Sequence, residues 1–120
     1  MSHVLTADGG TESLRVRIYD LDGRCVASHA EPYETKFMAG ARAEQNAEDW
    51  WSSLVTATQI CLKEANISGD AIDAMAYATT CCTVVALDKN GAPLRPALMW
   101  MDVRADKEAE AVMETGDQRL

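Results

Sequence analysis

The stretch "ADGGTESLRVRIYD", residues 7–20, decides how this 120-residue chain begins to fold. Leu14, Val16 and Ile18 alternate with polar residues, and this period of two is typical of a half-buried strand. Two glycines precede the strand, and Asp20-Leu21-Asp22-Gly23 follows it as a turn. The pattern predicts an antiparallel meander of three short strands over residues 4–8, 13–19 and 24–30.

Beyond the meander, the sequence predicts helices alternating with strands. Residues 31–45 show little periodicity and are expected to form a loop. A helix is expected over 46–66, with Asn46 as its cap and Asp49 answering it as in a capping box. Its apolar stripe comprises Trp51, Leu54, Val55, Thr58, Cys61, Leu62 and Ala65.

Residues 72–113 are predicted to form a strand, a hairpin and a helix. Residues 72–80 are mainly apolar and predict a strand that is buried on both faces. Asn90-Gly91 between the apolar runs 83–88 and 94–100 is a hairpin signal. A second helix is expected over 102–113, with Asp102 as its cap.

Composition limits the class of protein. Apolar residues make up 48% and charged residues 25%, as in one globular domain. The net charge of −8 disfavours binding to nucleic acid or to an anionic membrane. No membrane span or secretory signal is recognisable, so the expected location is cytoplasmic. Four cysteines without a CxxC pair, and only two histidines, argue for reduced thiols and against a zinc site.

The turn after the first predicted strand has two interpretations. Successive N–H groups beside glycines with positive φ can bind an anion, and Thr11, Ser13 and Arg15 could add phosphate contacts. Asp8 could hold Mg²⁺ directly or through water. The alternative is a polar hairpin turn that binds nothing, and this stretch alone leaves both readings open.

Three motifs in a fixed order resemble the FGGY family of carbohydrate kinases. Asp8-x-Gly-Thr-x-Ser-x-Arg15 resembles the family's first phosphate loop, and "AEQNAEDWW" (43–51) resembles the entry into its first long helix. "TVVALDKNGAPLRPALMWMDVRA" (83–105) resembles its hairpin and the W-x-D-x-R-A segment. The resemblance implies an α/β, ribonuclease-H-like (actin-like ATPase) domain with a mixed sheet and an inserted hairpin.

The resemblance also implies roles for individual residues. The enzyme would transfer phosphate from ATP, with Mg²⁺, to a hydroxyl of a sugar or polyol. The expected contacts to ATP are Asp8, Gly10, Thr11, Ser13 and Arg15, with Asp8 also on the metal. The expected contacts to the sugar are Thr80, Cys81, Cys82, Trp100, Asp102 and Arg104.

Some positions depart from the family pattern. Glu12 stands where some relatives have a hydroxyl residue, so one phosphate contact is expected to be lost. Cys81 and Cys82 replace the Arg-Glu or Met-His pairs of better-known members, which argues against glycerol and favours a ketose such as a pentulose. Ala47 replaces the usual proline after the helix cap, a purely structural difference.

Several of these residues also have a plain structural interpretation. Trp50 and Trp51 are expected in the core. Asp102 could be only a helix cap, and Arg104 could simply pair with a nearby acid. Cys81 and Cys82 could be small core residues. Two further expectations are that Glu44 and Gln45 order the loop, and that the acidic tail, residues 108–117, is a solvated helix face.

The resemblance covers only the leading part of a kinase. The catalytic aspartate and the nucleotide-binding domain would lie beyond residue 120, so the chain alone is expected to be inactive. The alternatives are a noncatalytic phosphate- or sugar-binding module, a ribonuclease-H-like nuclease, and Hsp70-like or actin-like ATPases. An incomplete sheet would leave the edge of the strand over 72–80 open, which predicts a homo-oligomer.

Overall fold

A four-stranded mixed sheet forms the larger part of the molecule. The structure is a computed structural model that describes residues 2–117. Strands β1 (His3–Gly9), β2 (Ser13–Asp20) and β3 (Cys25–Pro32) pair antiparallel, and β6 (Ile72–Thr79) lies parallel to β1. The order is β3-β2-β1-β6. The predicted meander and the predicted mixed sheet are confirmed.

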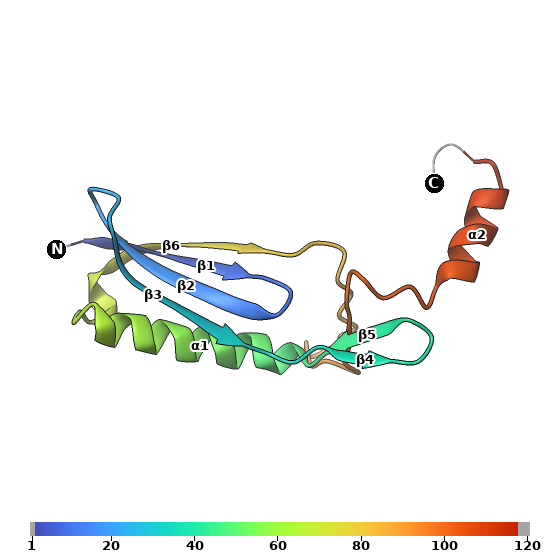
Figure 1. The fold of residues 1–120 in the computed structure, drawn as a ribbon, viewed down its shortest axis with the longest axis horizontal. Coiled ribbons are helices and arrows are strands. Elements are labelled where there is room, and N and C mark those ends of the chain that lie inside the picture. Colours follow the sequence, from blue (N-terminus) through green and yellow to red (C-terminus); the bar gives the residue numbers. More distant parts are fainter. Residues whose placement is uncertain (1, 118–120) are drawn as a thin grey trace.

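Helix α1 (Ala47–Glu64) packs along one face of this sheet, beneath β2 and β3 (Figure 1). The predicted alternation is confirmed, because Leu14, Val16 and Ile18 are fully buried. The rest of the buried cluster consists of Leu5, Ala7, Ala27, Ala57 and Cys61. This single layer of apolar contact fixes the position of every loop at the carboxyl end of β1.

The start of α1 follows the sequence in part. Asn46 is the N-cap, and its side-chain oxygen accepts from Glu48 N at 3.3 Å. Asp49 contacts the Asn46 amide at 2.8 Å instead of its backbone N–H, so the predicted capping box is not formed. Trp51 is 66% exposed, and its predicted place in the core is wrong. The buried face runs through Ser53, Ala57 and Cys61 instead.

A second, smaller sheet lies beyond the end of α1. Strands β4 (Lys36–Met38), β5 (Arg42–Gln45) and β7 (Ala97–Leu98) form it in the order β4-β5-β7. The expected loop over 31–45 is therefore wrong, since its second half is a hairpin. Its turn places Gly40 and Ala41 at φ values of 78° and 53°.

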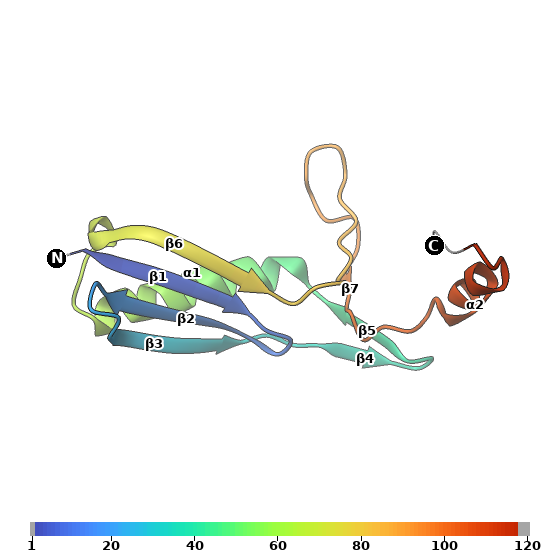
Figure 2. The same ribbon diagram turned by 90° about the horizontal axis from the view of Figure 1, so that it is seen from above.

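The predicted hairpin beyond β6 is confirmed. Val84 and Leu98 exchange two backbone hydrogen bonds of 2.9 Å, and Leu94 N donates to Ala86 O at 2.9 Å. At its tip, the carboxylate of Asp88 accepts from the backbone of Asn90 and Ala92. Figure 2 shows this segment rising from one side of the sheets.

Strand β6 lies at the open end of the sheet order, after a short turn of 3₁₀-helix (Gly69–Ala71). Every residue of β6 after Ile72 is exposed, including Met75 and Tyr77 at about half of their surface. The predicted burial on both faces is wrong, because α1 packs on β2 and β3 and no described segment covers β6. The apolar sequence instead leaves an open edge.

Helix α2 (Asp106–Glu114) stands away from both sheets (Figures 1 and 2). It begins four residues later than predicted, with Ala105 as its N-cap, so the predicted capping role of Asp102 is wrong. The molecule measures 58 × 30 × 28 Å, long for a chain of this size. Among the described residues, no helix has the length and apolarity that a membrane crossing requires.

Candidate functional site

The turn between β1 and β2 is the first part of the candidate site. Asp8 and Arg15 are directly opposite in the strand register, and Arg15 donates to Asp8 at 3.1 Å. Both side chains stay accessible, with 51% of Asp8 and 41% of Arg15 exposed. Ser13 opens β2 and is half-buried. The structure therefore places a carboxylate, a guanidinium and two hydroxyl residues around one tight turn.

The glycines of this turn serve close packing. Positive φ is found at Gly23, Gly40, Gly91 and Gly116, so the predicted positive φ in the phosphate loop is wrong for Gly9 and Gly10. A methyl group on Gly9 would come within 2.8 Å of the Tyr77 hydroxyl. A side chain at this position would therefore displace the Tyr77 hydroxyl of the neighbouring strand β6.

Three segments hold the turn in place through its four carbonyl oxygens, those of residues 9–12. The donors, in order along the turn, are Thr80 N at 3.1 Å, the Tyr33 hydroxyl, Gln45 Nε2 at 2.6 Å and Tyr33 N at 3.2 Å. Burial, with smaller contributions from Tyr77 and nearby acids, raises the pKa of Tyr33 to about 12. Tyr33 therefore remains a neutral donor over the whole physiological range.

Gln45 connects the turn to the helix. Its side chain is 2% exposed, and besides Thr11 O its amide donates to Thr35 Oγ1 at 2.6 Å. Its oxygen accepts from Trp50 Nε1 at 2.8 Å. Thr35 in turn donates to the Glu12 carboxylate at 3.0 Å. The prediction that Gln45 orders the loop is confirmed, and Trp50 is half-buried against it.

A hollow of about 320 Å³ adjoins the turn. It is lined by Thr11, Thr80, Cys81, Cys82 and Trp100. Trp100 Nε1 donates to Thr11 Oγ1 at 3.2 Å, and the indole is 53% exposed. One predicted phosphate-loop residue thus lies in the same wall as four predicted sugar contacts. Cys81 and Cys82 are exposed, so their alternative interpretation as core residues is wrong.

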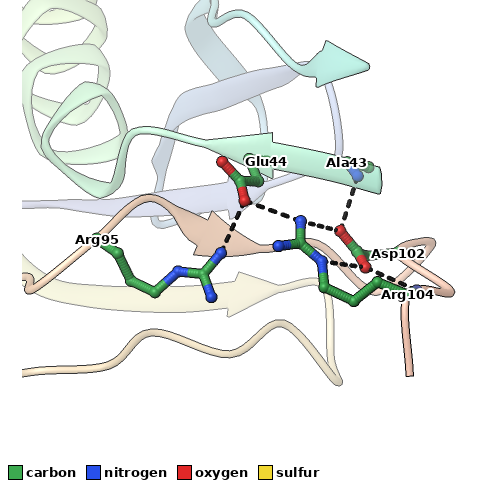
Figure 3. A network of polar contacts seen from close by, with 5 residues as sticks. All are labelled: Ala43, Glu44, Arg95, Asp102 and Arg104. Atoms are coloured by element: carbon green, nitrogen blue, oxygen red, sulfur yellow. Dashed lines mark hydrogen bonds and ion pairs between the residues drawn. The ribbon is translucent and has the colours of Figure 1, made fainter. Parts of the chain in front are cut away.

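The two other predicted sugar contacts, Asp102 and Arg104, form an ion-pair network with Glu44 and Arg95 (Figure 3). Arg104 binds both oxygens of Asp102, at 2.8 and 2.6 Å, and Glu44 at 2.8 Å. Arg95 reaches Glu44 from the other side at 2.7 Å. The expectation that Arg104 pairs with a nearby acid is confirmed, and Glu44 orders this segment as predicted.

Asp102 joins distant segments of the chain. Its side chain is 3% exposed, and it accepts from Ala43 N at 2.8 Å and from Arg104 N at 3.0 Å. These bonds, the Arg104 side chain first, hold the pKa of Asp102 well below its usual range. Hydrogen bonds from Arg104 likewise lower the pKa of Glu44. The network therefore fixes Trp100, two residues before Asp102, relative to β5.

Sequence reasoning found most of this site but missed two residues that shape it. Tyr33 and Thr35 lie in the stretch that was expected to be an irregular loop. Neither belongs to a periodic pattern or a motif, and each acts on a turn about 23 positions away. The β2–β3 pairing ends at Ser13 and Pro32, so a prediction of a third strand that continues past residue 30 would have placed Tyr33 beside Glu12.

Known carbohydrate kinases are similar to this chain in sequence. The model of the FGGY family of carbohydrate kinases, N-terminal domain, matches residues 3–120. A glycerol kinase of Acinetobacter baylyi is 33% identical over 97% of this chain and 24% of its own length. A xylulose kinase of Lactococcus lactis is 28% identical over 100% and 24%.

A solved structure has the same fold. The ligand-bound xylulose kinase of Lactobacillus acidophilus superposes with a TM-score of 0.88 at 19% identity, over 97% of this chain and 23% of that chain. The chain thus spans about a quarter of the length of these relatives.

Proposed function

Since this chain belongs to the FGGY family of carbohydrate kinases, we propose that it forms the sugar-binding side of an enzyme that phosphorylates a sugar or polyol with ATP. The observation that supports the proposal is the hydrogen bond from Trp100 to Thr11, which joins the β1–β2 turn to the wall of the hollow. Because the chain spans only a quarter of its relatives, we expect the catalytic base and nucleotide-binding domain in further sequence.

The turn suits a phosphate group. The N–H and C=O of a trans peptide point in opposite directions. The carbonyls of Gly10 and Thr11 are held from the protein side by Tyr33 and Gln45. The N–H groups of Thr11 and Glu12 therefore face the other way, where phosphate oxygens can accept from them. Arg15 keeps N–H donors beyond its bond to Asp8.

The same turn suits Mg²⁺ bound with ATP. Asp8 is half-exposed and only one of its oxygens contacts Arg15, so the other is available to the ion or to its water. Mg²⁺ binds through one or two carboxylates plus substrate phosphates, and when bound it neutralises charge on those phosphates. Asp8 would orient the metal, and Thr11, Ser13 and Arg15 would position the phosphates.

The hollow suits a sugar. The exposed indole of Trp100 offers an apolar face for C–H groups, and Thr80 offers a hydroxyl at the rim. Cys81 and Cys82 make this wall small and weakly polar. We propose a ketose such as a pentulose over glycerol, because Cys81 and Cys82 stand where better-known family members have larger side chains. Asp102 and Arg104 would act by holding the segment that carries Trp100.

We also propose a cytoplasmic location, supported by four cysteines that are all free thiols. A homo-oligomer is supported by the open edge of β6, with Met75 and Tyr77 exposed along it.

Activity is tested on the full-length protein whose reading frame contains this chain, beside the 120-residue chain alone. ADP release is measured with a panel of pentuloses and polyols. We expect turnover only in the longer protein. Asp8→Ala should lower kcat by roughly 10²–10³-fold with little change in sugar KM, since charge on phosphate develops in the transition state. Asp22→Ala, an exposed acid in the β2–β3 turn, is the matched control.

The sugar side is tested separately. Trp100→Ala should raise the sugar KM and leave the KM for ATP nearly unchanged, whereas Trp51→Ala, an exposed indole on α1, should change neither. Sugar-dependent turnover by the 120-residue chain, lost on Asp8→Ala, would contradict the proposal. So would a normal sugar KM in a folded Trp100→Ala protein.

A further inference from the structure

Two adjacent thiols face each other at the carboxyl end of β6. The sulfur atoms of Cys81 and Cys82 are 3.6 Å apart, with the Cys82 S–H directed at the Cys81 sulfur. Both residues are exposed and line the hollow beside Thr11 and Trp100. Solvent and small molecules therefore reach both sulfurs. Phosphoryl transfer to a sugar requires neither of them.

The backbone at this position is unusual. Cys82 has a φ of 63°, in the left-handed region that residues other than glycine and asparagine rarely adopt. The only other non-glycine residues with positive φ among those described are Ala41, in the β4–β5 turn, and Asn66, just after α1. Such a sparsely populated conformation, found here in a residue that lines the hollow, supports the hypothesis of a functional role for Cys82.

We propose that Cys81 and Cys82 are a reversible modification site, at which a two-electron oxidant of the peroxide class closes a disulfide between the two adjacent residues. The proposal does not depend on which substrate the hollow binds.

The reaction balances with hydrogen peroxide as the oxidant. The Cys81 sulfur attacks one peroxide oxygen and breaks the O–O bond, which gives a sulfenic acid and hydroxide, and the hydroxide takes up a proton. The Cys82 sulfur then displaces the sulfenic oxygen as water and forms the S–S bond. In sum, two thiols and one peroxide give one disulfide and two waters, with two electrons passing from sulfur to oxygen.

The order of the two sulfurs follows from their contact. The hydrogen bond to Cys81 raises the pKa of the Cys82 thiol. Because Cys82 is the donor in this contact and Cys81 the acceptor, we assign the first attack to the Cys81 sulfur. Cys82 already lies within contact of Cys81, so it is placed to resolve the sulfenic acid before a second oxidation.

The closed form should be easy to reduce. Adjacent Cα atoms are about 3.8 Å apart across a trans peptide, whereas disulfides usually span about 4.4–6.8 Å between Cα atoms. Disulfides outside the preferred geometry are the labile and regulatory ones. We therefore expect the thiol form to return as soon as a dithiol reductant is present.

The sequence allows a direct test by mass spectrometry. Trypsin cleavage after Lys63 and Lys89 releases residues 64–89, which contain only Cys81 and Cys82, while Cys25 and Cys61 fall in two other peptides. The folded chain is treated with hydrogen peroxide and its thiols are then blocked before digestion. We expect the peptide over 64–89 to lose two hydrogen atoms and escape blocking, and dithiothreitol to restore both thiols.

Single-residue variants distinguish closure of the disulfide from general oxidation of thiols. Cys81→Ser and Cys82→Ser should each abolish the loss of two hydrogens, whereas Cys25→Ser, which removes another exposed thiol, should leave it intact. The proposal is overturned if the peptide over 64–89 keeps both thiols while Cys25 is oxidised. It is also overturned if Cys81 and Cys82 gain oxygen separately, or if they link two chains instead of each other.

Discussion

Replacing Gln45 by alanine should destabilise the fold more than any other single polar change in the turn region. The side chain makes three hydrogen bonds, to Thr11 O, Thr35 Oγ1 and Trp50 Nε1, at 2.6, 2.6 and 2.8 Å, and it is 2% exposed. These bonds tie the β1–β2 turn, the 31–45 segment and α1 together.

The size of this destabilisation depends on the hydrogen-bonding groups that Gln45→Ala leaves without a partner. A protein hydrogen bond contributes about 1 kcal/mol net, and a buried group left without a partner costs about 1–3 kcal/mol. Thr35 keeps its bond to Glu12, and Trp50 is half-buried and can reach water, so these two lose less than Thr11. We expect the free energy of unfolding to fall by about 2–4 kcal/mol.

Urea unfolding followed by far-ultraviolet circular dichroism measures this loss. With a slope of about 2 kcal/mol per molar urea, the middle of the usual range, the midpoint should fall by about 1–2 M. Gln59→Ala, at an exposed position of α1, is the matched control and should stay within about 0.5 kcal/mol of the parent. Equal midpoints for the two variants would refute the role given to Gln45.

Gln45→Glu tests the direction of the bonds at the same site. Its ionised form keeps an acceptor for Trp50 but loses both N–H donors and faces the Thr11 carbonyl. Burial raises the pKa of such a carboxyl in the folded state, so the stability of the neutral form is fully present below the ordinary glutamate pKa of about 4.3 and is lost as the pH rises through the raised folded-state pKa. The free energy of unfolding that Gln45→Glu loses relative to the parent should therefore become smaller as the pH is lowered. A loss that stays constant with pH would contradict the assigned direction of the Gln45 hydrogen bonds.

Three further predictions concern other parts of the chain. Glu44 and Asp102 have lowered pKa values, so their contribution to stability is present above about pH 4 and lost as the pH falls further. As the pH is lowered, the urea midpoint of Glu44→Gln should therefore fall less steeply than that of the parent. Tyr33, with its pKa at about 12, contributes stability that is complete below pH 10 and is lost as the pH rises through about 12. Tyr33→Phe should remove the last step of the tyrosine absorbance titration. A late step that persists in this variant would belong to another tyrosine. The open edge of β6 should make sedimentation of the chain depend on concentration, and Met75→Lys, which charges this edge, should shift it to monomer; a parent chain that stays monomeric at all concentrations would contradict this.

The sequence predicted the elements whose pattern is local. The alternation of Leu14, Val16 and Ile18 reflects contact with α1 across a single interface, so the pattern and the burial agree. The Asn90-Gly91 turn likewise carries its own signal within four residues. For such elements the neighbours along the chain already determine the backbone, and periodicity is enough.

The predictions failed where the decisive contact is distant. Asp102 has the form of a helix cap, but it accepts from Ala43, 59 positions away, and α2 begins later. Trp51 fits an apolar stripe by size, yet it lies two residues before Ser53, which is about 200° around the helix. The residues that pack on the sheet are the small Ser53 and Ala57. Hydrophobicity alone therefore predicts the wrong buried face, because it favours Trp51, whose side chain is exposed.

The bond between Thr11 and Trp100 makes the two halves of the candidate site interdependent. The Thr11 hydroxyl accepts from the indole at 3.2 Å, while its carbonyl accepts from Gln45 at 2.6 Å. Trp100 is itself held two residues away, where Asp102 binds Ala43 of β5. A ligand that stacks on the indole must therefore preserve the contact to Thr11 or displace it. Displacement leaves the turn fixed through its carbonyls, so of the proposed phosphate contacts we expect sugar-side changes to reach only the Thr11 hydroxyl, in agreement with a nearly unchanged KM for ATP in Trp100→Ala.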